Sequence, residues 1–268
     1  MIVAVLGLGE AGSRISADLA REGVEVRGYD PADVVTPAGV IRQRTAGQAV
    51  RGAEMVLAIT AAADAATALA QGADGLESGV LYADLSTASP SLKVQLAASA
   101  AACGALFVDV ALMATVPGRG LHTPALASGP GAERYITTMS PYGISLEAIS
   151  TTPGDAATRK LLRSVFMKGL AAVVIEAMSA AEAAGQSAWL WRNLVDEVTA
   201  AGAPLLSRLV GGTSIHAERR LHEMEASAQL LADLGVDASM TRAVVASLHR
   251  VIRDGMPAIP VVDDEATT

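Results

Sequence analysis

Six residues near the start of the chain have the spacing of a pyrophosphate-binding turn. The segment from Gly7 to Gly12 has glycine at its first, third and sixth positions and follows a short apolar run. Such a turn between a strand and a helix lets backbone N–H groups contact phosphate oxygens, and the helix N-terminus adds partial positive charge. The pattern predicts a dinucleotide site formed by Gly7, Leu8, Gly9, Glu10, Ala11 and Gly12.

An acidic residue follows at a distance that suits this site. Asp30 lies 18 residues after Gly12, at the end of the second predicted strand. A carboxylate there can accept hydrogen bonds from the adenosine ribose and repels a 2′-phosphate, which favours NAD. An aspartate before Pro31 can also serve only the turn. Arg27 and Arg42 are nearby cations, so NADP is not excluded as the cofactor.

Three more polar residues come directly after predicted strands. Thr60 follows the run 55–59, and Ser86 and Thr87 follow the run 80–84. Ligands of parallel α/β sheets bind beyond the carboxyl ends of the strands. We therefore expect Thr60, Ser86 and Thr87 to bind the cofactor.

Three polar residues in the second half recur at every fourth position. Lys160, Ser164 and Lys168 lie near one face if this segment is helical. Lysines on an otherwise apolar stripe are costly unless they are paired, and a cationic neighbour in such surroundings favours the neutral amine that a general base requires. A solvated helix face is the alternative.

Further along, His216, Arg220 and Glu223 also share one predicted helical face. These side chains can reach a cleft, or they can form a solvated or subunit-facing network, which is the more common arrangement.

The elements that must position these groups are of two kinds. Strands are expected over 2–6, 24–29, 55–59, 80–84 and 106–110, with helices near 11–22, 45–51, 64–71 and 91–102. This alternation predicts crossover connections and a parallel sheet. Two further runs, 124–128 and 144–149, are expected as strands at its far edge.

After residue 154 the pattern becomes helical. Only Gly169 and Gly185 interrupt it between 155 and about 202, and further helices are expected over 216–234 and 239–253, with a frayed tail over 261–268. The sequence therefore predicts an α/β protein. A Rossmann domain with a parallel sheet covers 1–154, and an all-α substrate and dimerisation domain covers 155–268.

Composition narrows the possible partners. The chain is 51% hydrophobic with a net charge of −8, so it can bury a core but lacks the basic surface that nucleic acid requires. A single cysteine, Cys103, excludes an internal disulfide and a multi-cysteine zinc site. No apolar run approaches the length of a membrane span, and the N-terminus does not look like a signal peptide. We expect a cytoplasmic protein without metal.

Four blocks in this order resemble the β-hydroxyacid dehydrogenase family, which includes 3-hydroxyisobutyrate, tartronate semialdehyde and 6-phosphogluconate dehydrogenases. They are the glycine turn with Asp30, the segment from Asp84 to Pro90 (DLSTASP), the segment from Phe107 to Met113 (FVDVALM), and the segment from Lys160 to Ser164 (KLLRS). Glu176 and Gly185 also have the spacing from Lys160 found in the family's interdomain helix. The resemblance implies that Lys160 is the general acid/base and that the DLSTASP segment lies beside the nicotinamide.

Two departures concern the substrate. Met113, Ala114 and Thr115 replace the family's Ser-Gly-Gly, which contacts the substrate carboxylate, and Ser164 replaces its catalytic asparagine. This pattern is similar to a poorly characterised branch described as 6-phosphogluconate dehydrogenase-like. The resemblance to the family therefore predicts the type of reaction better than it predicts the substrate.

The resemblance implies hydride transfer between NAD(P) and the alcohol or carbonyl carbon of a small hydroxy acid. Lys160 and Ser164 are the catalytic candidates, and Met113, Ala114, Thr115 and Lys168 are the substrate-binding candidates for a small, anionic molecule. An imine reductase of the same architecture and a non-catalytic dinucleotide-binding protein are the alternatives. The long apolar helical half predicts a homodimer formed through these helices.

Overall fold

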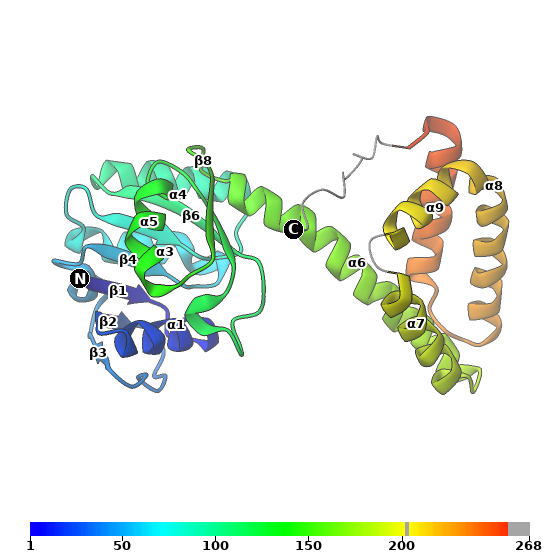
Figure 1. Ribbon diagram of the computed structural model, residues 1–268, viewed down its shortest axis with the longest axis horizontal. Coiled ribbons are helices and arrows are strands. Elements are labelled where there is room, and N and C mark those ends of the chain that lie inside the picture. The colour runs from blue at the N-terminus through cyan, green and yellow to red at the C-terminus, as the bar shows by residue number, and fades with distance from the viewer. Residues whose placement is uncertain (202–203, 257–268) are drawn as a thin grey trace. The chain divides into compact units, whose positions relative to one another are not determined.

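Successive residues of the first strand are buried on opposite sides of the sheet. In the computed structural model, which describes residues 1–201 and 204–256, β1 (Ile2–Leu6) places Val3 and Val5 in one hydrophobic cluster and Ala4 and Leu6 in another. A strand that is apolar on both faces must be covered on both faces. The first half of the chain is accordingly a sheet between two layers of helices (Figure 1).

Eight strands form this sheet in the order β3-β2-β1-β4-β5-β6-β7-β8. All neighbours are parallel except the antiparallel pair β6 and β7. From β1 the strand order runs to one edge through β2 and β3, and from β4 it runs to the other edge through β5. Folds of this kind bind ligands at such a reversal of strand order. The remaining strands are β2 (Glu25–Tyr29), β3 (Val40–Arg42), β4 (Met55–Ala58), β5 (Leu81–Asp84), β6 (Leu106–Leu112), β7 (Ala125–Ser128) and β8 (Leu146–Ser150).

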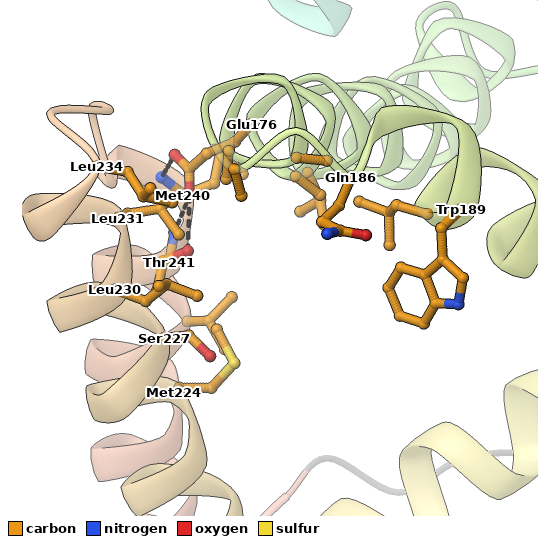
Figure 2. Close-up of a pocket in the computed structure, with 17 residues that line it drawn as sticks. Glu176, Gln186, Trp189, Met224, Ser227, Leu230, Leu231, Leu234, Met240 and Thr241 are labelled. Atoms are coloured by element: carbon orange, nitrogen blue, oxygen red, sulfur yellow. Dashed lines mark hydrogen bonds between the residues drawn. The ribbon is translucent and has the colours of Figure 1, made fainter.

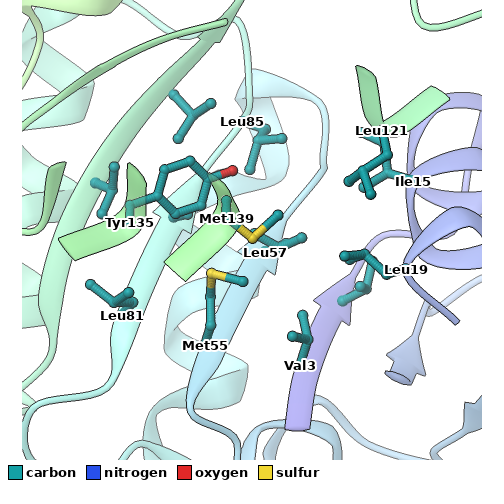
Figure 3. Packing of buried hydrophobic residues seen from close by; sticks show 14 of the residues in the cluster. Val3, Ile15, Leu19, Met55, Leu57, Leu81, Leu85, Leu121, Tyr135 and Met139 are labelled. Atoms are coloured by element: carbon teal, nitrogen blue, oxygen red, sulfur yellow. The ribbon is translucent and has the colours of Figure 1, made fainter. Parts of the chain in front are cut away.

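The helices divide between the two faces by their buried residues. Helices α1 (Glu10–Arg21) and α5 (Ala132–Met139) pack on the face of Val3, as Figure 3 shows for Ile15, Leu19, Tyr135 and Met139. Apolar residues of three other helices join the cluster around Leu6 on the opposite face. These are α2 (Ala46–Val50), α3 (Ala65–Gly72) and α4 (Pro90–Ala102).

Four helices follow the sheet: α6 (Asp155–Ala183), α7 (Ser187–Ala201), α8 (Pro204–Asp233) and α9 (Ser239–Asp254). The chain turns after α6 at Gly185 and after α8 at Gly235, both with a φ of 69°, a conformation that glycine adopts readily. Ala180 of α6, Leu231 of α8 and Ala238 form a small buried cluster.

The α/β fold class is confirmed, with a mainly parallel sheet followed by helices. The chain divides into two compact units, Met1–Val165 and Phe166–Thr268, so the division falls inside α6, two to three turns after residue 154. The first turns of α6 belong with the sheet because Ala156 and Ala157 are buried there.

Some local expectations need correction. The strand β3 and the helix α5 were not predicted, and Gly169 does not interrupt α6. Helix α8 consists of two helical stretches joined by a kink at His216 (φ −122°, ψ 30°). The second stretch agrees with the helix expected from 216, whereas the first, from Pro204, was not predicted. Arg220 and Glu223 lie on the second stretch, and His216 is at the kink. The predicted tail, 261–268, lies outside the described residues.

Candidate functional site

The glycine turn has two glycines that the fold itself requires and one that it does not. Gly7 has a φ of 99°, and a Cβ there would lie 2.3 Å from the Ile59 carbonyl oxygen; a Cβ on Gly12 would lie 2.0 Å from the Gly7 oxygen. Neither position can hold a larger residue without moving the backbone. A Cβ on Gly9 would meet nothing within 4 Å. Glycine at position 9 keeps the backbone open to a ligand, as a pyrophosphate requires.

The first turn of α1 starts directly at this open position. Gly9 is the N-cap of α1, and no side chain caps the helix. Uncapped N–H groups at a helix N-terminus attract anionic oxygens. The turn therefore has both the space and the donors that a dinucleotide phosphate needs.

A cavity of about 260 Å³ lies beside the turn, at the point where the sheet reverses between β1 and β4. Its lining includes Gly7, Gly9, Tyr29, Asp30 and Thr60. The predicted turn, the predicted acidic residue and one predicted polar residue after a strand are thus brought together at one crevice.

Asp30 organises this crevice as well as lining it. Its carboxylate accepts the backbone N–H of Leu8 at 2.7 Å and that of Ala32 at 2.9 Å. Arg42 donates to the backbone oxygens of Asp30 and Ala32, each at 2.8 Å. The guanidinium of Arg42 is therefore used in shaping the loop after β2. Arg27 is bound to Glu25 and to the backbone oxygen of Arg51.

The other predicted residues of the first unit lie along the same edge of the sheet. Strands β4, β5 and β6 are neighbouring and parallel, and Thr60, Ser86 and Met113 follow their carboxyl ends. Ser86 is buried, whereas Thr87 and Thr115 are exposed and Met113 and Ala114 are half-buried. The Oγ1 atom of Thr60 is buried and has no hydrogen-bond partner in the described structure, so its hydroxyl is available within the crevice.

A buried ionic cluster adjoins this edge, and the sequence interpretation missed it. The Lys93 ammonium on α4 lies 2.5 Å from Asp84 Oδ1 and 3.0 Å from Asp109 Oδ1, and all three side chains are fully buried. The available signal was the position of Lys93, which shares a helix stripe with the buried Leu96 and Ala100. A lysine at an apolar position of a helix requires a buried counter-ion.

Tyr82 lies near this cluster on the neighbouring part of β5. Burial raises the pKa of the Tyr82 phenol well above its ordinary value, and the negative charge of Asp84 raises it further. Its hydroxyl has no hydrogen-bond partner within the described residues. Tyr82 is thus a neutral group at every pH at which the protein would be assayed.

Helix α6 carries the predicted catalytic pair in the first unit. Lys160 and Ser164 are one turn apart and half-buried. Lys168 is exposed and belongs to the part of α6 that falls in the second unit. The roles of these three side chains stay predictions.

The second unit contains an apolar cavity of about 460 Å³ lined by α6, α7, α8 and α9 (Figure 2). Glu176 lies at one end and caps α9, accepting the backbone N–H groups of Met240 at 2.7 Å and Thr241 at 2.8 Å and the Thr241 hydroxyl at 2.6 Å. Partial burial alone would raise the pKa of Glu176, but these hydrogen bonds outweigh it and hold the pKa below its ordinary value.

In the predicted cluster around His216, Arg220 contacts residues on the other side of the kink in α8. Arg220 donates to the Leu209 backbone oxygen at 2.8 Å and to the Thr213 hydroxyl. Glu223 pairs with Arg219 at 3.4 Å.

Among residues 1–201 and 204–256, no three His, Cys, Asp or Glu side chains are grouped as metal ligands. In the same ranges no helix is long and apolar enough to cross a membrane.

Two family models match different parts of the chain. Residues 2–128 match the family described as the NAD binding domain of 6-phosphogluconate dehydrogenase, and residues 181–251 match a domain of unknown function, DUF1932. An uncharacterized 28.5 kDa protein in the 7S RNA 5′ region of Methanothermus fervidus is 30% identical over 118 residues. That match covers 44% of this chain and 45% of the relative.

Solved structures share the fold over nearly the whole chain. A conserved hypothetical protein from Sinorhizobium meliloti is 28% identical with a TM-score of 0.61, covering 96% of this chain and 91% of that one. An imine reductase from Myxococcus stipitatus, in complex with NADP⁺, is 18% identical with a TM-score of 0.79 and 95% coverage of both chains. The first part of the chain, residues 2–128, is thus similar to the NAD binding domain of 6-phosphogluconate dehydrogenase, and residues 181–251 are similar to the domain of unknown function DUF1932.

Proposed function

We propose that this protein is an NAD(P)-dependent oxidoreductase that transfers a hydride between the nicotinamide and the alcohol or carbonyl carbon of a small hydroxy acid. The observation that carries the proposal is the crevice at the reversal between β1 and β4, where Gly9 leaves the backbone open to a dinucleotide. Ser86, Thr87 and Met113 follow neighbouring strand ends on the same edge. We assign the second, smaller reactant to this edge, beside the cofactor.

The chain's own residues handle the proton and the orientation of the substrate. The bound nicotinamide would accept or supply the hydride. Lys160 takes the hydroxyl proton when the alcohol is oxidised and returns a proton to the carbonyl oxygen in the reverse direction. Ser164, one turn further along α6, hydrogen-bonds the same oxygen. We assign Lys168 to the anionic group of the substrate, and we also assign Met113, Ala114 and Thr115 to substrate binding.

Replacement of Lys160 tests this assignment. Lys160→Met keeps most of the side-chain volume but removes the proton-transfer group, so kcat should fall at least about 100-fold. The dissociation constant for the reduced cofactor, measured by its fluorescence, should change less than about threefold. Lys168→Met serves as the matched variant, because loss of an anion-binding group should raise KM more than it lowers kcat. Full turnover by Lys160→Met would refute the role of Lys160.

An imine reductase is the second candidate, and the fold shared with the Myxococcus stipitatus enzyme favours it. The family resemblance, in which Lys160 is the general acid/base, favours the hydroxy-acid proposal instead. Purified protein should be assayed with cyclic imines and with 2- and 3-hydroxy acids. Turnover of imines alone would replace the first proposal. Binding of cofactor without turnover of either panel would favour a non-catalytic dinucleotide-binding protein.

For the cofactor we propose NAD(H), because the negative charges of Asp30 and of the exposed Asp33 would repel a 2′-phosphate. NADP(H) is the rival, since the imine reductase of the same fold is in complex with NADP⁺. The ratio of kcat/KM for the two cofactors decides between them.

We also propose that two copies associate through the helical part of the chain. Exposed apolar side chains are concentrated on α6 and α7, including Val165 (76%), Ile175 (66%) and Trp189 (62%). Apolar surface on this scale marks an interface, and the apolar cavity of Figure 2 offers a complementary surface. Light scattering should give twice the chain mass of 27.2 kDa. Ile175→Glu should shift the mass toward the monomer, and a monomeric wild-type protein would refute the proposal.

A further inference from the structure

Four polar residues form a row across four neighbouring strands. The Cα partners in the sheet are Asp84 with Asp109, Asp109 with Ser128, and Ser128 with Ser150. Directly paired residues point to the same face of a sheet. Asp84, Asp109 and Ser128 are all buried. A polar row beneath a helical layer is costly unless each group has a partner.

The first turn of α6 supplies the partners at one end of the row. Ser128 Oγ accepts the backbone N–H of Ala156 at 3.0 Å, and Asp109 Oδ2 accepts that of Ala157 at 2.9 Å. The Ser150 hydroxyl donates to Asp155 Oδ2 at 2.6 Å. Two N–H groups of the helix N-terminus are thus capped by side chains from two strands, and Ser150 of a third strand holds the side chain of Asp155.

Helix α4 supplies the partner at the other end. Lys93 Nζ donates to Asp84 Oδ1 at 2.5 Å and to the Asp84 backbone oxygen at 2.8 Å, and it lies 3.0 Å from Asp109 Oδ1. A Cβ on Gly154, just before α6, would lie 2.9 Å from the backbone oxygen of Pro90, so α4 and α6 begin in close contact.

The same cluster holds the segment that follows β5. Ser86 Oγ donates to Asp84 Oδ1 at 2.5 Å, on the oxygen that also receives Lys93. One ammonium therefore connects two segments that belong to different parts of the proposed site. Through Asp84 it holds the Ser86 segment at the sheet edge. Through Asp109 it holds the first turn of α6, which continues to Lys160.

We propose that Lys93 is a positioning residue that fixes the start of α6 relative to the Ser86 segment. This rests on the proposed function insofar as it assigns Ser86 to the cofactor and Lys160 to proton transfer. Lys93 does not touch the reacting atoms. Its charge keeps the two aspartates side by side in the sheet, where they would otherwise repel each other, and their remaining hydrogen bonds then define where each segment lies.

The test compares Lys93→Met with Val94→Met in the full-length protein. Both variants introduce the same side chain, but position 94 is exposed on the same helix. Amide hydrogen exchange should become at least about tenfold faster at Ala156, Ala157 and the Ser86 segment in Lys93→Met, with β1 and β4 unchanged. Val94→Met should match the wild type. An equal rise across the whole sheet, or unchanged exchange at Ala156 and Ala157, would overturn the proposal.

Turnover provides the second measurement. Lys93→Met should lower kcat at least about tenfold per cofactor-occupied molecule, and it should also raise the dissociation constant for the cofactor, because the Ser86 segment belongs to the proposed cofactor site. Full kcat per occupied molecule would show a purely structural role for Lys93 and overturn the proposal. If the wild type turns over no substrate, the proposed function fails, and the exchange result alone then decides the role of Lys93.

A second variant covers the case in which Lys93→Met does not fold. Lys93→Met/Asp84→Asn buries one carboxylate instead of two, so it avoids the repulsion that would unfold the single variant. The connection between α4 and Asp109 is still absent, so exchange at Ala156 and Ala157 should still be faster than in wild type. Wild-type protection of these two amides in the double variant would overturn the proposal.

Discussion

The backbone N–H of Leu8 donates to the carboxylate of Asp30 at 2.7 Å. The acidic residue at the end of β2 thus supports the glycine turn in addition to lining the crevice next to it. Two roles that the sequence offered as alternatives, a structural one and a ligand-binding one, are compatible in a single side chain. A carboxylate oxygen can accept more than one hydrogen bond.

The charge of Asp30 can be removed while its acceptor is kept. Asp30→Asn retains an oxygen for the Leu8 N–H, so the glycine turn should persist, although the acceptor for the Ala32 N–H is lost. The kcat/KM ratio for NADPH over NADH should rise about tenfold, because the amide no longer repels a 2′-phosphate. Asp33→Asn makes the same change in charge at an exposed neighbour and should have a smaller effect. Equal ratios in wild type and Asp30→Asn would show that this residue does not select the cofactor.

Substitutions at two glycines of the turn should affect the stability of the protein and its affinity for the dinucleotide differently. Gly9→Ala should leave the melting temperature nearly unchanged, because its Cβ would meet nothing within 4 Å, yet weaken dinucleotide binding at least about tenfold. Gly12→Ala should destabilise the protein by about 1–3 kcal/mol through the clash with Gly7. Gly47→Ala, with its nearest neighbour at 3.7 Å, is the control. Unchanged cofactor affinity in Gly9→Ala would place the phosphates elsewhere.

Because Glu176 caps α9, the free energy of unfolding should depend on pH in the acidic range. The folded pKa of Glu176 lies below its ordinary value, so its contribution is complete above the unfolded pKa of about 4.3 and is lost as pH falls through the folded pKa. At pH 7 Glu176→Gln should cost about 1 kcal/mol in urea unfolding. The difference from wild type should shrink below pH 4.

A matched substitution checks that this effect is specific. Glu182→Gln removes the same charge from an exposed position on the same helix and should leave stability within about 0.5 kcal/mol of wild type. A pH-independent difference between wild type and Glu176→Gln would mean that the charge of Glu176 does not stabilise α9.

Two buried tyrosines should resist ionisation. Burial raises the pKa of Tyr135, and burial together with Asp84 raises that of Tyr82, both well above the ordinary value of 10.0. The unfolded chain releases these protons near pH 10, so stability is intact below that pH and falls as pH rises above it. Absorbance at the tyrosinate wavelength should show both phenols ionising only on unfolding. Tyr135→Phe should therefore leave the titration of the native protein unchanged; a smaller native absorbance change would contradict this.

Local patterns predicted most of the first unit. The runs 2–6 and 55–59 are apolar on both faces, which only a covered parallel strand explains, and β1 and β4 confirm them. β3 has three residues, which are too few to show a period. The kink at His216 coincides with the start of the helix expected over 216–234, while the helical stretch before it, from Pro204, was not recognised.

The nicotinamide-dinucleotide-binding domain was determined by the sequence itself. A glycine turn is a local device, since Gly7, Gly9 and Gly12 act within one strand, one turn and one helix. The partners within the ionic cluster were decided only by the tertiary structure. Lys93 at an apolar helix position indicates that a buried counter-ion is needed, but it does not indicate that Asp84 and Asp109 provide it, and one partner of Asp109 is an amide 48 residues away. Whether a buried charge is compensated depends on what the fold places beside it, and chain spacing does not encode that contact.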